Sequence, residues 1–207
     1  GGTQVLKLFH AYMSDTAVQY EHHISRLIYE AGVSAPAVEA QIVEVDGRKG
    51  LIYERIGGVS MFHQLTKTPW LVRRLAHQMA ELHRSIHAHM SADLPSQRQQ
   101  FQNRIQAAPR LTDGEKRRVL DYLDSLPDGE AVCHGDFHPD NIMITAHEVV
   151  ALDWTNAVRG NALADVARTS LMLSSGRLPP HMGLGRRLVT RFARQVFHDA
   201  YLHRYCY

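Results

Sequence analysis

The sequence predicts a bilobal α+β fold, with a small mixed N-terminal lobe and a larger, mainly helical C-terminal lobe. Two observations lead to this prediction. Residues 5–56 follow the order strand, helix, strand, strand, whereas after Gly57-Gly58 most apolar residues recur at helical spacing. The 207 residues are enough to build two small lobes around a cleft. We therefore expect an N-terminal lobe over residues 1–57 and a C-terminal lobe over residues 58–207.

The first strand is predicted over Val5–Phe9 (VLKLF), where apolar residues alternate around Lys7. This alternation is typical of a half-buried strand and places Lys7 on its more polar face. A helix follows, because Ser14 or Asp15 can cap a segment whose apolar residues recur at helical spacing until a glycine ends it. Glu21 falls in the middle of this helix.

Two further strands complete the small lobe. They are predicted over Gln41–Val45 and Leu51–Ile56. The dipeptide Asp46-Gly47 lies between them and is typical of a tight hairpin turn. The sequence therefore predicts that these two strands pair with each other.

Helices dominate the second half of the chain. Thr68-Pro69 begins a long helix with one apolar face, and Thr112–Glu115 (TDGE) has the form of a capping box that begins another. Two more helices are predicted near residues 162–174 and 184–205. The apolar face of the first helix consists of Leu71, Leu75, Met79, Leu82 and Ile86.

Three short strands, residues 130–133, 142–144 and 149–152, surround a segment that is dense in polar side chains, HGDFHPDN. In phosphoryl transfer an aspartate accepts the proton of the attacking hydroxyl, while an asparagine and a second carboxylate hold magnesium. Asp136, Asn141 and Asp153 have these chemical types in this order. Their spacing around a hairpin is typical of a protein-kinase-like active site.

The segments CHGDFHPDNIMI, ALDWTNA and GNALADVART resemble the aminoglycoside phosphotransferase and choline kinase superfamily, whose loop reads close to HGDxHxxN. The resemblance implies a protein-kinase-like fold and a catalytic base at Asp136. It also implies magnesium ligands at Asn141 and Asp153, and structural support of the catalytic loop by His134 and Asp165. The implied reaction moves the γ-phosphoryl group of ATP, or alternatively of GTP, to a hydroxyl of a small molecule with the help of Mg²⁺.

The remaining parts of such a site can be assigned in the N-terminal lobe. Lys7 on its strand can reach the α- and β-phosphates, and Glu21 can pair with it. Glu30 is the rival partner, but it lies at the end of the helix and would point away from a lysine in the middle of the strand. At the end of the last strand, the Glu54 carbonyl and the Ile56 amide are the expected partners of adenine.

One departure from the kinase pattern is that no glycine-rich loop precedes Lys7. We expect that this loop lies upstream of the sequence given. Two other functions stay open at this point. The chain can be a pseudokinase-type nucleotide-binding module without transferase activity, or a metal-dependent hydrolase that uses His134, Asp136 and His138.

Composition limits the partners. Charged residues make up 21% of the chain, hydrophobic residues 44%, and the formal net charge is +2, so neither disorder nor a nucleic-acid surface is indicated. No apolar run approaches the roughly 18 residues of a membrane span, and no signal peptide is recognisable. The two distant cysteines fit a reducing compartment. We expect a cytoplasmic protein that binds neither nucleic acid nor membrane; its oligomeric state is left open.

The identity of the acceptor is also open among aminoglycosides, choline, homoserine, sugars and thiamine. From residue 166 onward there are seven arginines and one acid, Asp199, which favours a neutral or partly anionic hydroxylated metabolite over a polycation. Alternatively, these arginines line solvated helix faces, or acids such as Asp121 and Asp140 supply an acidic pocket. His83 and His87 share a helix face but are predicted to be ordinary helix residues rather than metal ligands. The seven arginines are Arg168, Arg177, Arg186, Arg187, Arg191, Arg194 and Arg204.

Overall fold

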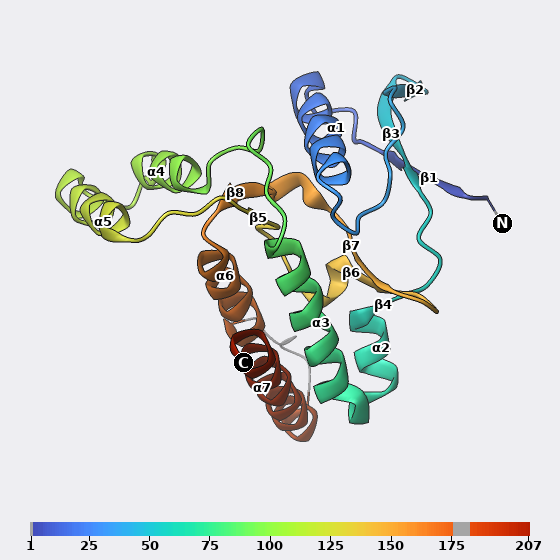
Figure 1. Ribbon diagram of the computed structural model, residues 1–207, viewed down its shortest axis with the longest axis vertical. Helices are drawn as coiled ribbons and strands as arrows, with labels where there is room; N and C mark the ends of the chain where they lie inside the picture. The colour runs from blue at the N-terminus through green and yellow to red at the C-terminus, as the bar shows by residue number, and fades with distance from the viewer. Residues whose placement is uncertain (1, 176–182) are drawn as a thin grey trace.

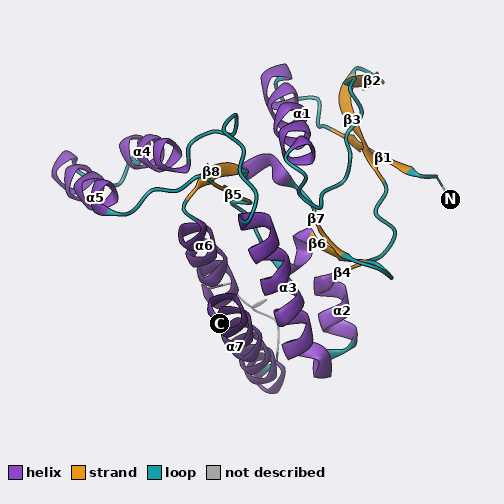
Figure 2. Ribbon diagram, viewed as in Figure 1, coloured by secondary structure: helices purple, strands orange, loops and turns teal. Residues whose placement is uncertain are grey.

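The computed structural model describes residues 2–175 and 183–207, apart from the side chains of residues 184 and 186. It confirms the predicted α+β class, with small antiparallel sheets and a larger set of packed helices (Figures 1 and 2). The boundary predicted at residue 57 stays a prediction. None of the described helices is long and apolar enough to cross a membrane.

The N-terminal sheet has three antiparallel strands in the order β1-β3-β2. These are β1 (Gln4–Leu8), β2 (Val43–Val45) and β3 (Arg48–Glu54). Lys7 pairs with Leu51 of the central strand, so its backbone is fixed by hydrogen bonds in the middle of β1. The three strands correspond to the three that the sequence predicts for this part of the chain.

Local signals for the turn and the helix cap are confirmed. Asp46 and Gly47 both have positive φ angles, 51° and 71°, as a two-residue hairpin turn requires. The Ser14 hydroxyl accepts a hydrogen bond from the backbone nitrogen of Ala17 at 3.2 Å and so caps the following helix. One strand is shorter than predicted, because pairing of β2 with β3 begins only at Val43.

Helix α1 (Asp15–Glu30) contributes to two hydrophobic cores. Val18 packs with Leu51 in a small core beneath the N-terminal sheet. Ile24 and Ile28 are fully buried in the main core of the molecule. The helix therefore attaches the N-terminal sheet to the rest of the chain.

The main core lies among three long helices, α3 (Val72–His87), α6 (Ala162–Ser175) and α7 (Leu184–Cys206). In Figure 1, α3 runs beside α7, and these two helices share the most extensive contact between any two described elements. Four of the five predicted apolar positions of α3 are buried; the fifth, Leu71, belongs to a short 3₁₀ turn before the helix. The four are Leu75, Met79, Leu82 and Ile86.

Two small antiparallel sheets hold the polar segment 134–141. One pairs β5 (Ala131–Cys133) with β8 (Val158–Gly160), and the other has the order β4-β6-β7. The predicted strands β5, β6 and β7 are confirmed to within one residue. The strands β4 and β8 were not predicted, because two or three residues are too few to show alternation. The second sheet consists of β4 (Val59–Ser60), β6 (Ile142–Ile144) and β7 (Val149–Ala151).

Three shorter helices complete the described chain: α2 (Met61–Lys67), α4 (Gln97–Ala107) and α5 (Asp113–Ser125). The sequence predicts α5, whose capping box between Thr112 and Glu115 is present. It does not predict α2 or α4. The reason is clear for α4, whose sequence QRQQFQNRIQA has only two large apolar residues and no apolar stripe.

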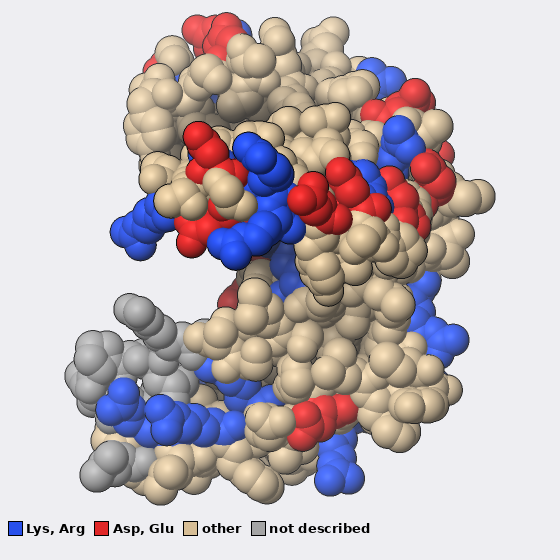
Figure 3. Space-filling model, turned by 90° about the vertical axis from the view of Figure 1, so that its left-hand side faces the viewer, with Lys and Arg blue, Asp and Glu red and all other residues tan. Residues whose placement is uncertain are grey.

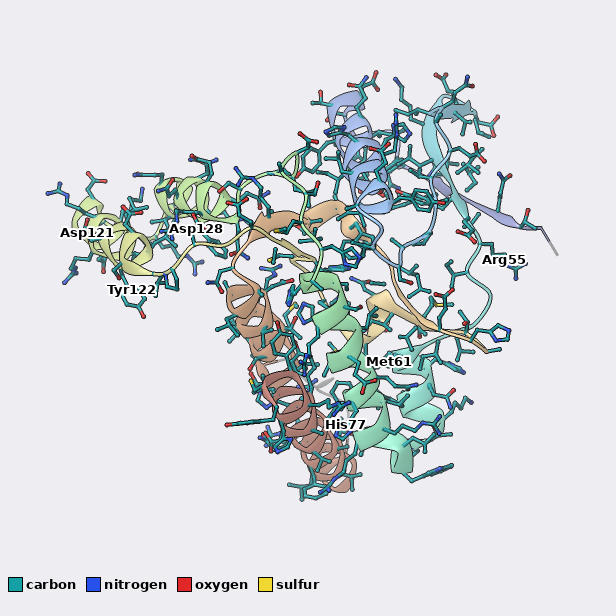
Figure 4. All side chains as sticks on the ribbon, viewed as in Figure 1. Arg55, Met61, His77, Asp121, Tyr122 and Asp128 are labelled. Atoms are coloured by element: carbon teal, nitrogen blue, oxygen red, sulfur yellow. The ribbon has the colours of Figure 1, made fainter. Side chains whose placement is uncertain are left out.

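Helices α4 and α5 form a hairpin, here called the arm (residues 97–125), that extends from the body of the molecule (Figure 1). Within the described chain, α5 buries none of its residues. Asp121 and Tyr122 point from α5 into solvent (Figure 4), and Tyr122 is 66% exposed. The arm thus adds little to the hydrophobic core.

Candidate active site

The polar segment begins with a tight backbone turn at Gly135. Its φ angle is 75°, and a Cβ atom at this position would collide with the backbone oxygen of Asn156. Only glycine meets both requirements, since other residues rarely adopt positive φ. The turn directs the chain from β5 toward Asp136.

Asp165, in the first turn of α6, holds this turn in place. Its carboxylate accepts hydrogen bonds from the backbone nitrogens of His134, at 2.7 Å, and Gly135, at 3.0 Å. The side chain is 1% exposed. Support of the loop by Asp165, which the sequence resemblance implies, therefore has a direct physical basis.

The same carboxylate also accepts hydrogen bonds from two histidines of α3. His83 Nε2 lies 3.1 Å and His87 Nε2 lies 3.3 Å from Asp165 Oδ2. On the other side of each ring, Nδ1 accepts a hydrogen bond from a tyrosine hydroxyl of α7, Tyr201 for His83 and Tyr205 for His87. The two tyrosine–histidine pairs connect α7 and α3 to the loop through Asp165.

Burial decides the charge states in this network. It lowers the pKa of His83 to about 4, so this ring is neutral at pH 7. Burial opposes ionisation of Asp165, but the hydrogen bonds from His83 and His87 outweigh it and keep the pKa of the carboxyl below its usual range. Asp165 is thus ionised and fully hydrogen bonded. The sequence could not reveal that His83 and His87 meet an acid from residue 165.

His134 is fully buried, and both of its ring nitrogens are engaged. Nε2 donates to the Leu152 carbonyl at 3.0 Å, and Nδ1 accepts from the backbone nitrogen of Asp136 at 3.2 Å. The ring therefore stabilises the loop rather than offering a nitrogen to a metal. This arrangement removes the first ligand of the alternative hydrolase site.

The carboxylate of Asp136 is 30% exposed and is approached from two sides. Arg168 Nη2 of α6 lies 3.5 Å from its Oδ1, and His138 Nε2 lies 3.6 Å from its Oδ2. The sequence identifies Arg168 only as one of several C-terminal arginines. Arg168 is one turn beyond Asp165 on the same helix, so the placement of α6 that brings Asp165 to the loop also brings Arg168 to Asp136.

Asn141 and Asp153 come from the two ends of the hairpin formed by β6 and β7. Asn141 Nδ2 donates to the backbone oxygen of Asp136 at 3.1 Å, which leaves its amide oxygen available. The backbone nitrogen of Leu152 donates to the Asn141 carbonyl at 2.8 Å and brings the two ends together. Asp153 has a left-handed backbone, with φ 62°, and its carboxylate is 50% exposed. Such conformations in residues other than glycine are frequent at functional sites.

Lys7 reaches this carboxylate from the N-terminal sheet. Its Nζ atom lies 2.6 Å from Glu21 Oε1 and 3.4 Å from Asp153 Oδ1. The predicted pairing of Lys7 with Glu21 is therefore present, whereas Glu30 pairs with Arg26 of its own helix. Burial opposes the charge on Lys7, but the hydrogen bond and the charge of Glu21 outweigh it and raise the pKa of Lys7.

A cavity of about 650 Å³ joins these elements. Glu54 and Ile56 line it at the end of β3, and Lys7 lines it from β1. Asn141 and Asp153 close it from the side of the β6–β7 hairpin. Residues predicted from distant parts of the chain therefore meet in one space of a size that suits a nucleotide.

The site combines a buried loop, a free asparagine oxygen and a lysine–glutamate pair. Together with the fold, this arrangement defines a phosphotransferase of the kinase-like type. The chain belongs to the phosphotransferase enzyme family (APH), whose family model matches residues 1–204. A search among curated proteins finds no match. Family membership confirms the resemblance on which the sequence interpretation rests.

Solved structures with the same fold include three enzymes with different names. A thermostable mutant of aminoglycoside phosphotransferase APH(4)-Ia matches with a TM-score of 0.55 and 20% identity over 98% of this chain and 76% of that chain. Amicoumacin kinase hAmiN, in complex with AMP-PNP, Ca²⁺ and Ami, matches with a TM-score of 0.58 and 18% identity over 98% and 65%. A choline/ethanolamine kinase family protein from Mesorhizobium loti matches with a TM-score of 0.53 and 16% identity over 98% and 64%.

Proposed function

We propose that this protein transfers the γ-phosphoryl group of ATP, with GTP as an alternative donor, to a hydroxyl group of a small molecule. The hydroxyl oxygen forms a bond to the γ-phosphorus while the bond from that phosphorus to the β–γ bridging oxygen breaks. The hydroxyl proton passes to the Asp136 carboxylate, and ADP leaves. No phosphoenzyme is required.

The observation that carries this proposal is the cavity in which Lys7, Asn141 and Asp153 meet. Lys7, held by Glu21, is positioned to bind the α- and β-phosphates. At the other end of the cavity, the Glu54 carbonyl and the Ile56 amide are the candidate partners of adenine. The proposal is further supported by the amicoumacin kinase structure, which contains AMP-PNP and a divalent ion.

The residues present fit a magnesium ion. Asn141 offers a free amide oxygen and Asp153 a half-exposed carboxylate, and hard oxygen ligands of this kind are those that Mg²⁺ prefers. When bound, magnesium would neutralise negative charge on the phosphates. Asp136 lies beside Asn141 without being part of this pair, so its carboxylate remains available as a base.

A phosphate-transfer screen tests the proposal. The protein is incubated with Mg²⁺, ATP or GTP, and a panel of aminoglycosides, choline, homoserine, sugars and thiamine. The expected result is acceptor-dependent formation of ADP or GDP that Asp136→Ala abolishes. Nucleotide binding without transfer to any acceptor would instead identify a nucleotide-binding module.

A further inference from the structure

We infer that Arg168 and Arg104 form a cationic subsite beside the catalytic carboxylate and that this subsite binds an anionic group of the acceptor, a carboxylate or a phosphate. The inference rests on the proposed function, since it concerns the acceptor of that reaction. It makes the predicted acceptor more specific, because it assigns recognition of the acceptor's negative charge to two residues. Of the seven C-terminal arginines, Arg177 lies outside the described residues, as does the side chain of Arg186.

Arg168 lies beside Asp136, the carboxylate that the acceptor hydroxyl approaches in the proposed reaction. Its Nη2 atom is 3.5 Å from Asp136 Oδ1, at the outer limit of a hydrogen bond. Its Nε atom is buried and has no hydrogen-bond partner among the described residues. A buried donor of this kind ordinarily has a partner, because leaving it unpaired costs free energy. The guanidinium group thus has donors that Asp136 does not use.

Arg104, on α4 of the arm, faces the same small pocket as Arg168. Its Nη2 atom lies 3.4 Å from Gln100 Oε1, and among the described residues it forms no ion pair with an acid. Gln97 and Phe101 of the arm, and Gly135 of the catalytic loop, also line this pocket. Arg104 and Arg168, which come from different elements, therefore both line this pocket next to the loop.

The acid that lines this pocket is already engaged. Asp165 is the only carboxylate among the described lining residues, and its oxygens accept hydrogen bonds from the loop backbone and the α3 histidines. Asp121, one of the acids that could have served a polycation, lies on the outer end of the arm (Figure 4). Asp128 is held by Arg98 at 2.8 Å.

Figure 3 shows a hollow beneath the arm, bordered above by the arm and below by the helices near the C-terminus. On the upper border Lys and Arg atoms lie among Asp and Glu atoms, and further Lys and Arg atoms lie below the hollow. The entrance therefore carries charges of both signs, and the preference for an anion is assigned to Arg168 and Arg104.

The inference is tested with acceptors matched in shape but not in charge. Glucose, glucuronate and glucose 6-phosphate share a sugar ring, and kanamycin serves as the polycation. We expect kcat/KM for glucuronate, glucose 6-phosphate or both to exceed that for glucose by at least about tenfold. Arg168→Gln and Arg104→Gln should each lower the ratio of kcat/KM for the anionic sugar to kcat/KM for glucose by about tenfold, as expected for a lost hydrogen bond to a charged group. The KM for ATP should be unchanged.

Two further variants sharpen the result. Arg168→Lys keeps the charge and should retain part of the preference, whereas Arg74→Gln, at an exposed position of α3, should have no effect. If Arg168→Gln lowers kcat/KM equally for glucose and for the anions, Arg168 only positions Asp136 and the inference is wrong. A preference for kanamycin over the anionic sugars would also overturn it.

A binding measurement separates failure of the inference from failure of the proposed function. If no acceptor is phosphorylated, the proposed reaction fails, and calorimetric titration with glucuronate and glucose 6-phosphate still reports on the subsite. Binding that Arg168→Gln and Arg104→Gln weaken at least about tenfold supports the subsite. Absence of binding heat for both anions in the unmodified protein rejects it.

Discussion

Lys7 Nζ and Asp153 Oδ1 lie 3.4 Å apart although 146 positions separate these residues in the sequence. The contact connects β1 of the N-terminal sheet to the end of β7. Both side chains are partly exposed, at 41% and 50%, so the pair itself contributes little to stability. Its importance is that it places a cation and the carboxylate proposed to bind the metal on the same side of one cavity.

Lys7→Met is expected to weaken ATP binding by at least about tenfold, because it removes the proposed phosphate contact while keeping the apolar stem. Binding can be measured by calorimetric titration with Mg²⁺ and AMP-PNP. Lys67→Met, at an exposed position of α2, is the matched control. Unchanged nucleotide affinity in Lys7→Met would contradict the role of Lys7.

Asp136→Asn should reduce turnover by about 10²- to 10⁴-fold, since a positioned base accounts for a factor of this size. The nucleotide contacts are left in place, so affinity for AMP-PNP should stay the same. Single-turnover rates and titrations on the same preparation measure the two quantities. A loss of affinity as large as the loss of rate would show that Asp136 acts in binding instead.

Asp153→Asn should remove the dependence of nucleotide binding on magnesium, because it replaces the charged candidate ligand. The measurement compares AMP-PNP affinity with and without Mg²⁺. In the unmodified protein Mg²⁺ should strengthen binding, and in the variant it should have little effect. An equal effect of Mg²⁺ on both proteins would mean that the ion is held elsewhere.

Asp165→Asn is expected to lower the free energy of unfolding by about 1–3 kcal/mol, since the amide keeps one acceptor oxygen but leaves a buried donor without its partner. Urea unfolding followed by circular dichroism measures this loss. Asp93→Asn, at an exposed position before α4, provides the control. A variant as stable as the unmodified protein would show that the network around Asp165 is not a stabilising element.

Stability should fall as the pH is lowered from about 6.5 to 4. The pKa of His83 is about 4 in the folded protein and near 6.5 in the unfolded chain, so between these values the unfolded state binds more protons. The stabilisation is complete above pH 6.5 and decreases toward pH 4 by about 3 kcal/mol. Urea midpoints at several pH values measure the slope.

Two histidine variants test the source of this slope. His83→Gln should reduce it, whatever its effect on absolute stability, because one titrating group is gone; His134, whose pKa is also lowered by burial, keeps part of the slope. His77→Gln, on the exposed side of the same helix (Figure 4), should leave the slope unchanged. An unchanged slope in His83→Gln would assign the pH dependence to other groups.

Local patterns made much of the fold predictable. The Ser14 cap, the Asp46-Gly47 turn and the apolar face of α3 each follow from interactions within a few residues, and each is confirmed. Helix α4 was not predicted, because its sequence has no apolar stripe that would indicate how it packs against the rest of the chain. Propensity and periodicity do not report such tertiary packing.

Prediction of the candidate site from the sequence is limited in the same way. The HGDFHPDN segment is enough to predict Asp136 and Asn141 as candidate site residues, because both lie in one stretch of eight consecutive residues. The partners of Asp165 could not be predicted from the sequence, because His83 and His87 are 82 and 78 positions away and no local pattern marks them. The proximity of Arg168 to Asp136 likewise depends on how α6 is placed against the loop.

The arm has a consequence for how this enzyme can change over evolutionary time. Because α5 buries none of its residues within the described chain, most substitutions along it should leave folding intact. Arg104 nevertheless extends from the arm toward the pocket beside the catalytic loop. New acceptor preferences can therefore arise by drift in a surface hairpin, while the residues that perform the chemistry stay under a separate and stricter selection.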